Sequence, residues 1–141
     1  MEIVNRKARY DYTFLKTETA GIELVGSEIK SIRSSNVSLA DSFCIFQNGE
    51  LFLKGALIKE NGTAFSHKEN RDRKLLMKRR ELEKLQKELV KGLTIVPYKI
   101  FFNSRGWAKM EIALAKGKKD YDKRETVKKR EIERQIRNEK S

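Results

Sequence analysis

Cations and aromatic rings are the side chains with the clearest chemistry in this chain. Its 141 residues contain 32 Lys or Arg and 20 Asp or Glu, which gives a formal charge of +12 and a pI near 9.9. Cationic groups neutralise phosphates, and aromatic faces stack on unpaired bases. Tyr10, Tyr12 and Phe14 follow a basic run, and Tyr121 lies inside KKDYDKR. The composition therefore predicts a nucleic-acid partner.

Residues that could carry catalysis are scarce. The sequence has one His and one Cys, no pair of them at zinc spacing and no glycine-rich phosphate loop. Cys44, in the apolar run SFCIF, is expected to be a buried thiol, and His67, in the polar segment FSHKEN, is expected at the surface. We predict a protein without enzymatic activity, metal or cofactor. The alternative is a magnesium-dependent nuclease that uses Asp41, Glu50 or Glu111, because such ligands converge from distant positions.

The charge is spread over two parts of the chain. Residues 115–141 contain eleven Lys or Arg against six Asp or Glu, a net charge of +5, which leaves +7 for residues 1–114. The only aliphatic residues beyond Ala115 are Val127, Ile132 and Ile136, too few to offset the entropy of ordering the segment. We therefore expect a folded RNA-binding domain over residues 1–116 and a basic tail over 117–141 that is disordered when free.

The N-terminal region reads as strands followed by a short helix. Residues 10–14 and 21–25 alternate as strands do, with Gly21 suited to a bulge, and a short helix capped by Ser27 follows. The alternative is one continuous helix through Ile22, Val25, Ile29 and Ile32.

The first ten residues lack the apolar core of a signal peptide, and no apolar run approaches the roughly 20 residues that span a bilayer. A cytoplasmic protein with no membrane partner is expected.

The middle and end of the body alternate between strands and one helix. Residues 42–47 and 50–55 read as strands around Asn48-Gly49, a pair typical of tight hairpin turns. Residues 71–91 place leucines on one helical stripe, at positions 75, 82, 85 and 89. The basic face opposite that stripe fits either solvent or an anionic partner. Residues 93–102 and 107–115 read as a final antiparallel pair, so five or six strands with helices between them predict a small closed barrel.

Most aromatic side chains of the body are expected in its core. They are Tyr10, Tyr12, Phe14, Phe43, Phe46, Phe101 and Phe102. Tyr121 differs, because no large apolar residue lies within five positions of it on either side. Its ring is expected to contact a partner.

Several segments in this order resemble one family. They are NRKARYDY at 5–12, AGIELVGSEIKSIR at 20–33, NGELFL at 48–53, RDRKLL at 71–76, GLTIVPYKIFF at 92–102 and AKGKKDYDKRETVKKR at 115–130. Together they resemble the SsrA-binding protein (SmpB) family over nearly the whole chain. Thr19 departs from the pattern, since the family often has Glu there, which puts any RNA contact of that carboxylate in doubt.

The resemblance implies a fold and a function. It implies an OB-fold-like, mainly β barrel of antiparallel strands with about three α-helices. Such a barrel would bind the tRNA-like domain of transfer-messenger RNA (tmRNA, SsrA RNA), stand in for its missing anticodon arm and deliver it to stalled ribosomes for trans-translation. The tail would occupy the decoding centre and the empty messenger channel and fold into a helix there. Elongation factor Tu would be an indirect partner through aminoacylated tmRNA.

The resemblance also assigns residues. The tmRNA-binding residues would be Asn5, Arg6, Lys7, Lys30, Arg33 and Leu76. Those at the small-subunit decoding centre and along the tail would be Gly117, Lys118, Lys119, Tyr121, Asp122, Lys123, Arg124, Lys128, Lys129 and Arg130. A general single-stranded RNA-binding protein on the same barrel remains an alternative.

Overall fold

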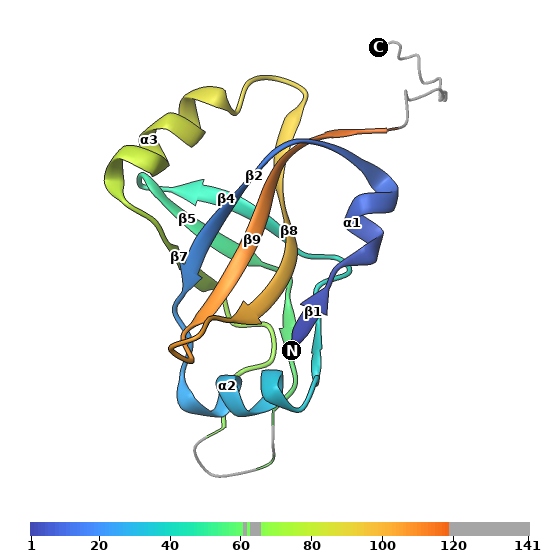
Figure 1. The fold of residues 1–141 in the computed structure, drawn as a ribbon, viewed down its shortest axis with the longest axis vertical. Helices are drawn as coiled ribbons and strands as arrows, with labels where there is room; N and C mark the ends of the chain where they lie inside the picture. Colours follow the sequence, from blue (N-terminus) through green and yellow to red (C-terminus); the bar gives the residue numbers. More distant parts are fainter. Residues whose placement is uncertain (61, 63–65, 119–141) are drawn as a thin grey trace.

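A mainly antiparallel β fold with three helices makes up the described part of the chain, as predicted (Figure 1). The computed structural model describes residues 1–60, 62 and 66–118. Its elements are β1 (Glu2–Val4), α1 (Arg6–Asp11), β2 (Tyr12–Ile22), α2 (Gly26–Arg33), β3 (Val37–Ser38), β4 (Phe43–Gln47), β5 (Glu50–Lys54), β6 (Leu57–Ile58), β7 (Arg73–Leu76), α3 (Arg79–Glu88), β8 (Leu93–Phe102) and β9 (Ala108–Gly117). No helix in these ranges is long and apolar enough to cross a membrane.

Six strands form a ring. The order β8-β4-β5-β7-β2-β9 closes because β9 also pairs with β8, and β1 adds to the outside of β8. The long strands β2, β8 and β9 are paired over most of their length, whereas β2 meets β7 at only Gly21 and Ile22. β3 and β6 pair separately. The predicted small barrel is confirmed. Because the β2–β7 and β4–β8 pairings that close it are short, helices can pack against its ends.

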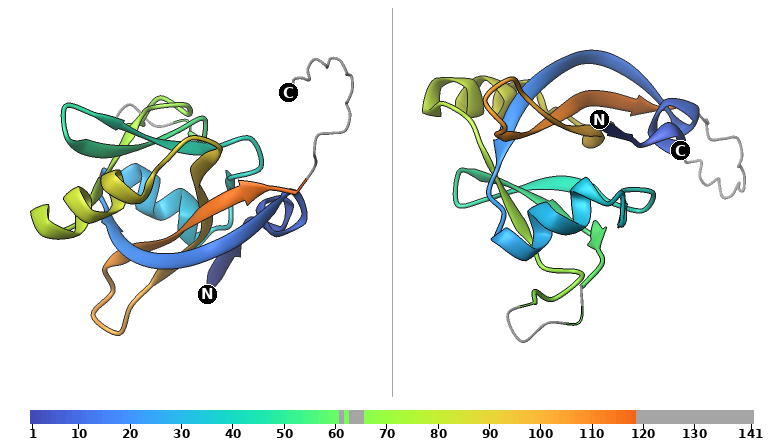
Figure 2. Two further views of the ribbon diagram at one scale, coloured as in Figure 1. Left: turned by 90° about the horizontal axis from the view of Figure 1, so that it is seen from above. Right: turned by 60° about the horizontal axis from the view of Figure 1, so that its bottom comes forward.

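The core lies inside this ring. Alternate residues of the strands are fully buried, among them Leu51, Leu53, Ile95 and Ile112. The aliphatic residues Ile32 of α2 and Leu82 and Leu85 of α3 belong to the same cluster. Figure 2 shows the two helices on different sides of the barrel, so helix burial covers its open ends.

Local signals identified the hairpins correctly. β4 and β5 pair across Asn48 and Gly49, whose φ angles of 53° and 78° are the left-handed values that this dipeptide tolerates. β8 and β9 form the predicted final pair. The strand-then-helix interpretation of residues 21–33 holds, because β2 runs to Ile22 and α2 begins at Gly26.

The predicted helix over residues 71–91 is wrong in its first part. Residues 73–76 form strand β7, and α3 begins only at Arg79. Arg73 and Leu75 are buried while Leu76 is exposed, which is the period of a strand. Leu75 fits both a helical and a strand pattern, so its spacing from the later leucines was misleading.

Three smaller predictions about residues 10–27 also need correction. Tyr10 and Asp11 end helix α1 and do not begin a strand. The register shift in β2 lies between Phe14 and Lys16, so Gly21 is not in a bulge. The N-cap of α2 is Val25, whose backbone N–H donates to the Glu28 carboxylate, so Ser27 does not cap the helix.

The aromatic residues divide between core and surface. Tyr10 is 79% exposed and Phe43 is 43% exposed, so their predicted burial is wrong. Phe46 and Phe102 pack against the main core, and Tyr12 and Phe14 pack on a second, smaller cluster around Ala8. Phe101, the last of the aromatic residues predicted in the core, is half-buried.

Candidate nucleic-acid interface

A partly apolar hollow of about 550 Å³ lies where the end of β2 meets β7, α2 and the β8–β9 turn. Its lining consists of Gly21, Ile22, Glu23, Leu24, Ile29, Leu76 and residues 105–109, and we call it the Trp107 hollow. Trp107 is 65% exposed and Leu76 is 47% exposed. Large apolar side chains exposed together around a concave site usually mark a binding surface.

The backbone of the β8–β9 turn fixes the place of Trp107. The Asn103 side-chain oxygen accepts hydrogen bonds from the backbone N–H groups of Arg105 (3.0 Å) and Trp107 (2.9 Å). On the other side of the hollow, Gly21 lies opposite Leu76 in the β2–β7 pairing, and a Cβ at Gly21 would come within 3.2 Å of the Leu76 Cβ. A larger residue at position 21 would therefore push Leu76 away and widen this closure.

The hollow has the chemistry of a site for an unpaired nucleotide. Trp107 offers an aromatic face, Leu76 and Ile29 offer apolar surface, and Arg105 and Lys109 add cations that suit phosphate. Of these residues the sequence reasoning had named only Leu76. A lone Trp between an Arg and a Lys, at a predicted turn, was the signal that could have identified the rest.

The two predicted residues on α2 lie beside this hollow. Lys30 is exposed and follows Ile29, which lines the hollow. Arg33 is exposed too, and its guanidinium lies 4.1 Å from the centre of the Phe102 ring. This cation–π contact holds the end of α2 against β8 and leaves the Arg33 guanidinium at the surface.

A buried charge network ties α2 to β7. Glu28 is fully buried and accepts hydrogen bonds from Arg71 Nη2 (2.6 Å) and Arg73 Nε (2.8 Å). Arg73, also fully buried, donates further to the carbonyl oxygens of Ala56 and Glu69. We call Glu28, Arg71 and Arg73 the Glu28 network.

The network keeps its charges at ordinary pH. Burial alone would raise the pKa of Glu28, but hydrogen bonds from Arg71, from the Val25 backbone and from Arg73 outweigh it and lower that pKa to about 2. Burial lowers the pKa of Arg73, and the hydrogen bond to Glu28 opposes that effect. The sequence interpretation missed this role, because it placed Arg71 and Arg73 in a helix, and Glu28 lies 43 and 45 residues away from them in the chain.

At the other end of the barrel, Asn5 is buried and its side chain makes three hydrogen bonds within the protein. Its Nδ2 donates to the carbonyl oxygens of Leu39 (3.2 Å) and Pro97 (2.9 Å), and its Oδ1 accepts from the Ala8 N–H at the start of α1. Asn5 therefore positions α1, and both of its amide N–H groups are engaged within the protein.

The neighbouring cations are held differently. Arg6 and Lys7 are exposed, and Lys7 pairs with Asp41 at 3.0 Å. Arg9 lies 4.5 Å from the Phe14 ring centre and 5.1 Å from that of Tyr98, which holds α1 on the barrel. Only Arg6 and Lys7, of the predicted residues here, present charge to a partner.

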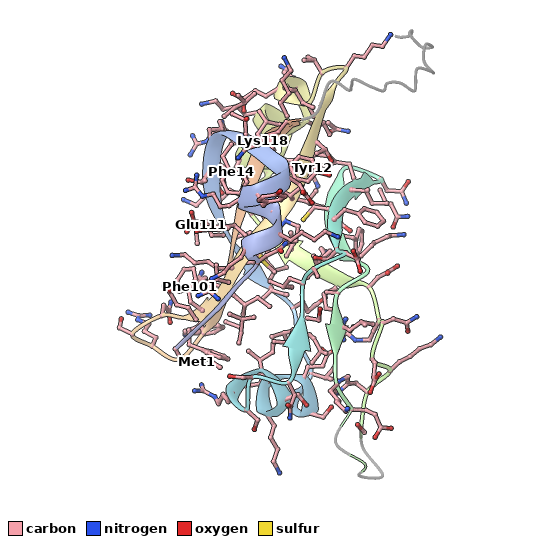
Figure 3. The ribbon with its side chains drawn as sticks, turned by 90° about the vertical axis from the view of Figure 1, so that its right-hand side faces the viewer. Met1, Tyr12, Phe14, Phe101, Glu111 and Lys118 are labelled. Carbon is pink, nitrogen blue, oxygen red and sulfur yellow. The ribbon has the colours of Figure 1, made fainter. Side chains whose placement is uncertain are left out.

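The root of the predicted tail lies next to α1. Gly117 pairs with Tyr12, and the Lys118 N–H donates to the Asp11 carbonyl at 3.0 Å. Figure 3 shows Lys118 near Tyr12 and Phe14. Because β9 starts at the Trp107 hollow and runs ten residues to Gly117, the two places are about 30 Å apart. The remaining predicted tail residues, Lys119, Tyr121, Asp122, Lys123, Arg124, Lys128, Lys129 and Arg130, lie outside the described residues.

The carboxylates proposed for a nuclease are not brought together. Asp41 pairs with Lys7, Glu50 with Lys74 at 2.8 Å, and Glu111 with Lys99 at 3.7 Å. Across residues 1–60, 62 and 66–118, no group of three or more His, Cys, Asp or Glu gathers that could hold a metal ion.

The surroundings of the single His and the single Cys indicate structural roles for both residues. His67 is partly exposed, and its ring nitrogens lie 2.8 Å from Ser27 Oγ and 2.7 Å from the Ile58 carbonyl, so it lies at the edge of the surface with both nitrogens engaged within the protein. Cys44 is buried as predicted, and burial raises the pKa of its thiol. A thiol in this state is a poor nucleophile.

Comparison with known proteins gives one consistent result. A model of the family described as "SmpB protein" matches residues 2–141. The SsrA-binding protein of Christiangramia forsetii is 52% identical over 139 residues, which cover 96% of this chain and 88% of that protein. That of Thermosipho melanesiensis is 52% identical over 136 residues, covering 94% and 92%. A solved structure described as "tmRNA-SmpB: a journey to the center of the bacterial ribosome" is similar with a TM-score of 0.74 and 45% identity, covering 94% of this chain and 95% of that one.

Proposed function

The chain belongs to the SmpB family, and from this premise we propose that it binds the tRNA-like domain of tmRNA and brings it to stalled ribosomes for trans-translation. The names of its relatives and of the similar solved structure support tmRNA and the ribosome as partners. The protein acts by binding and positioning, and the ribosome supplies the chemistry. Action at the ribosome would take place in the cytoplasm.

The observation that carries the proposal is the Trp107 hollow. An unpaired base of the tRNA-like domain stacks on Trp107 and packs against Leu76, while Arg105 and Lys109 meet its phosphates. Lys30 and Arg33 extend the contact along α2. Thr19 is exposed on β2 two residues before Gly21, so this chain relies on the aromatic ring and the cations where many relatives have a carboxylate.

The C-terminal tail is assigned to the ribosome. In this proposal residues 1–116 bind tmRNA, and residues 117–141 enter the decoding centre and the empty messenger channel of the small subunit. Gly117 and Lys118 start the tail beside α1, while the exposed Arg6 and Lys7 belong to the tmRNA-binding residues of the barrel. Tyr121 would stack on a base of the decoding centre. Elongation factor Tu would join through the aminoacylated tmRNA, with the barrel in place of an anticodon arm.

Competition between RNAs at two salt concentrations tests the proposal. We expect the full-length protein to bind a tRNA-like-domain fragment of tmRNA at least tenfold more tightly than an ordinary tRNA or an unstructured single strand. This preference should persist at high salt, because phosphate attraction weakens with salt while shape and stacking contacts do not. Equal binding to all three RNAs would indicate a general RNA-binding protein. Magnesium-dependent cleavage of any of them would indicate the nuclease.

A further inference from the structure

Helix α3 carries three cations on the side that faces away from the barrel. Leu82 and Leu85 are buried on its inner side. A helix turns every 3.6 residues, so Arg80, Lys84 and Lys87, spaced by four and three positions, share the opposite side. All three are exposed. They form a row about 10 Å long, which we call the α3 stripe.

The α3 stripe forms no salt bridge within the described part of the chain, and the one acidic side chain beside it is Glu83, so its three cations keep a net positive charge. The other two acidic residues of α3 are engaged elsewhere. Glu81 accepts from the Lys78 N–H at 2.9 Å, and Glu88 pairs with Lys16 at 2.6 Å. The stripe thus keeps its positive charge available to a partner.

Helix stability does not explain the cations at the start of α3, although Lys87 in the last turn suits the helix dipole. Lys78, Arg79 and Arg80 lie at the N-terminal end of α3, where the helix dipole is positive and favours acidic side chains. Placing three cations there works against the helix. Local choices that oppose the fold are expected mainly at functional sites.

The position of α3 indicates the partner. Leu76 lines the Trp107 hollow, and α3 begins at Arg79, three residues farther along the chain (Figure 1). Three residues span at most about 11 Å, so an RNA strand that leaves the hollow past Leu76 and follows β7 reaches the first turn of α3. We propose that the α3 stripe binds backbone phosphates of the tRNA-like domain of tmRNA, outside the nucleotide held in the hollow. This inference rests on the proposed function.

The test neutralises the stripe in the full-length chain. In the variant R80Q/K84Q/K87Q, affinity for the tRNA-like-domain fragment should fall about tenfold near 0.1 M salt. The slope of log K against log salt should become shallower by about two, because each phosphate contact contributes roughly 0.7 to 0.9. The melting temperature should change little, since losing Arg80 from the first turn favours the helix dipole and losing Lys87 from the last turn opposes it.

Two controls make the result specific. K84Q/K87Q is compared with K59Q/K68Q, which removes two exposed lysines away from α3 and should leave affinity within twofold. The single tryptophan of the chain is Trp107, so its fluorescence reports on the hollow. Quenching by a short unstructured RNA should be the same in the stripe variant and the unaltered protein.

Several results would overturn the inference. They are unchanged affinity of the stripe variant, an equal loss in K59Q/K68Q, or a loss seen with small ribosomal subunits and not with the tmRNA fragment. Failure of the proposed function looks different, because the unaltered protein would then show no preference for the tmRNA fragment over ordinary tRNA.

Discussion

The two ends of the barrel use arginine in opposite ways. Beside the Trp107 hollow, Arg73 is fully buried, and both Arg71 and Arg73 form ion pairs with Glu28. Next to α1, Arg6 is exposed, and Arg9 lies over two aromatic rings. Both arginine-rich segments look equally suited to RNA in the sequence. The comparison teaches that a basic motif can supply the scaffold of a binding site as well as its contacts.

The two ends of the barrel also differ in the interactions that hold their helices in place. The Glu28 network joins α2 to β7, so the hollow between them is formed before RNA arrives. At the other end, α1 is six residues long and depends on one buried amide, one exposed salt bridge and cation–π contacts. We expect the first end to be rigid and to select RNA, and the second to be held less firmly where the tail that enters the ribosome begins.

Removing the tail should separate the two ends most strongly. Deletion of residues 119–141 leaves every residue of the barrel and its β9–β2 pairing in place. Affinity for the tRNA-like-domain fragment should stay within a few-fold, while peptide tagging on stalled ribosomes should be lost. A tenfold loss of affinity for the fragment would show that the tail takes part in binding tmRNA. Barrel and tail would then not have separate partners.

Replacing Glu28 by Ala should cause the largest loss of stability of any single change discussed here. It leaves Arg73 buried without a counter-charge, a change that typically costs about 3 to 5 kcal/mol of unfolding free energy. Urea unfolding measures it. Asp41→Ala is the matched control at the other end, because it breaks the exposed pair with Lys7 and should hardly change the urea midpoint. Similar midpoints for the two variants would contradict the contrast.

Acid should act on the same network. The pKa of Glu28 falls from 4.5 to about 2 on folding, so its contribution is complete above pH 4.5 and is lost as pH drops toward 2. At about 1.4 kcal/mol per pKa unit, this contribution is about 3 kcal/mol. Urea midpoints measured between pH 5 and 2 should fall steeply, and Glu28→Gln should flatten that dependence. Identical pH profiles would remove Glu28 from the explanation.

Asn5 tests the weaker end. Asn5→Ala removes the cap of α1 and leaves the Leu39 and Pro97 carbonyl oxygens without their donor, at a cost of about 1 to 3 kcal/mol. Asn5→Asp can still accept from the Ala8 N–H but cannot donate, so it separates the two effects. If both variants keep full stability yet lose RNA affinity, Asn5 contacts RNA directly and our positional role for it is wrong.

Local features of the fold were predictable from the sequence, and distant ones were not. Asn48-Gly49 determines its hairpin through the backbone of two adjacent residues, and the long strands β8 and β9 show their own alternation. Leu75 satisfied both strand and helix periods, so only its pairing with Leu51 and Ile22 decides the matter.

The candidate site shows the same limit. Glu28 and Arg73 are 45 residues apart, and no spacing rule relates them. The Trp107 hollow likewise joins four separate segments. Leu76 was found through a family resemblance, whereas Trp107 emerged only once the β8–β9 turn had been placed beside β7.

The most direct test compares one exposed aromatic residue from each end in the full-length protein. Trp107→Ala and Tyr10→Ala each remove a ring that is mostly exposed, so neither should unfold the barrel. Affinity for the tRNA-like-domain fragment should fall by about 1 to 3 kcal/mol, or roughly 5- to 150-fold, in Trp107→Ala. In Tyr10→Ala it should stay within twofold. Equal losses, or a larger loss for Tyr10→Ala, would contradict the claim that tmRNA is gripped at the hollow.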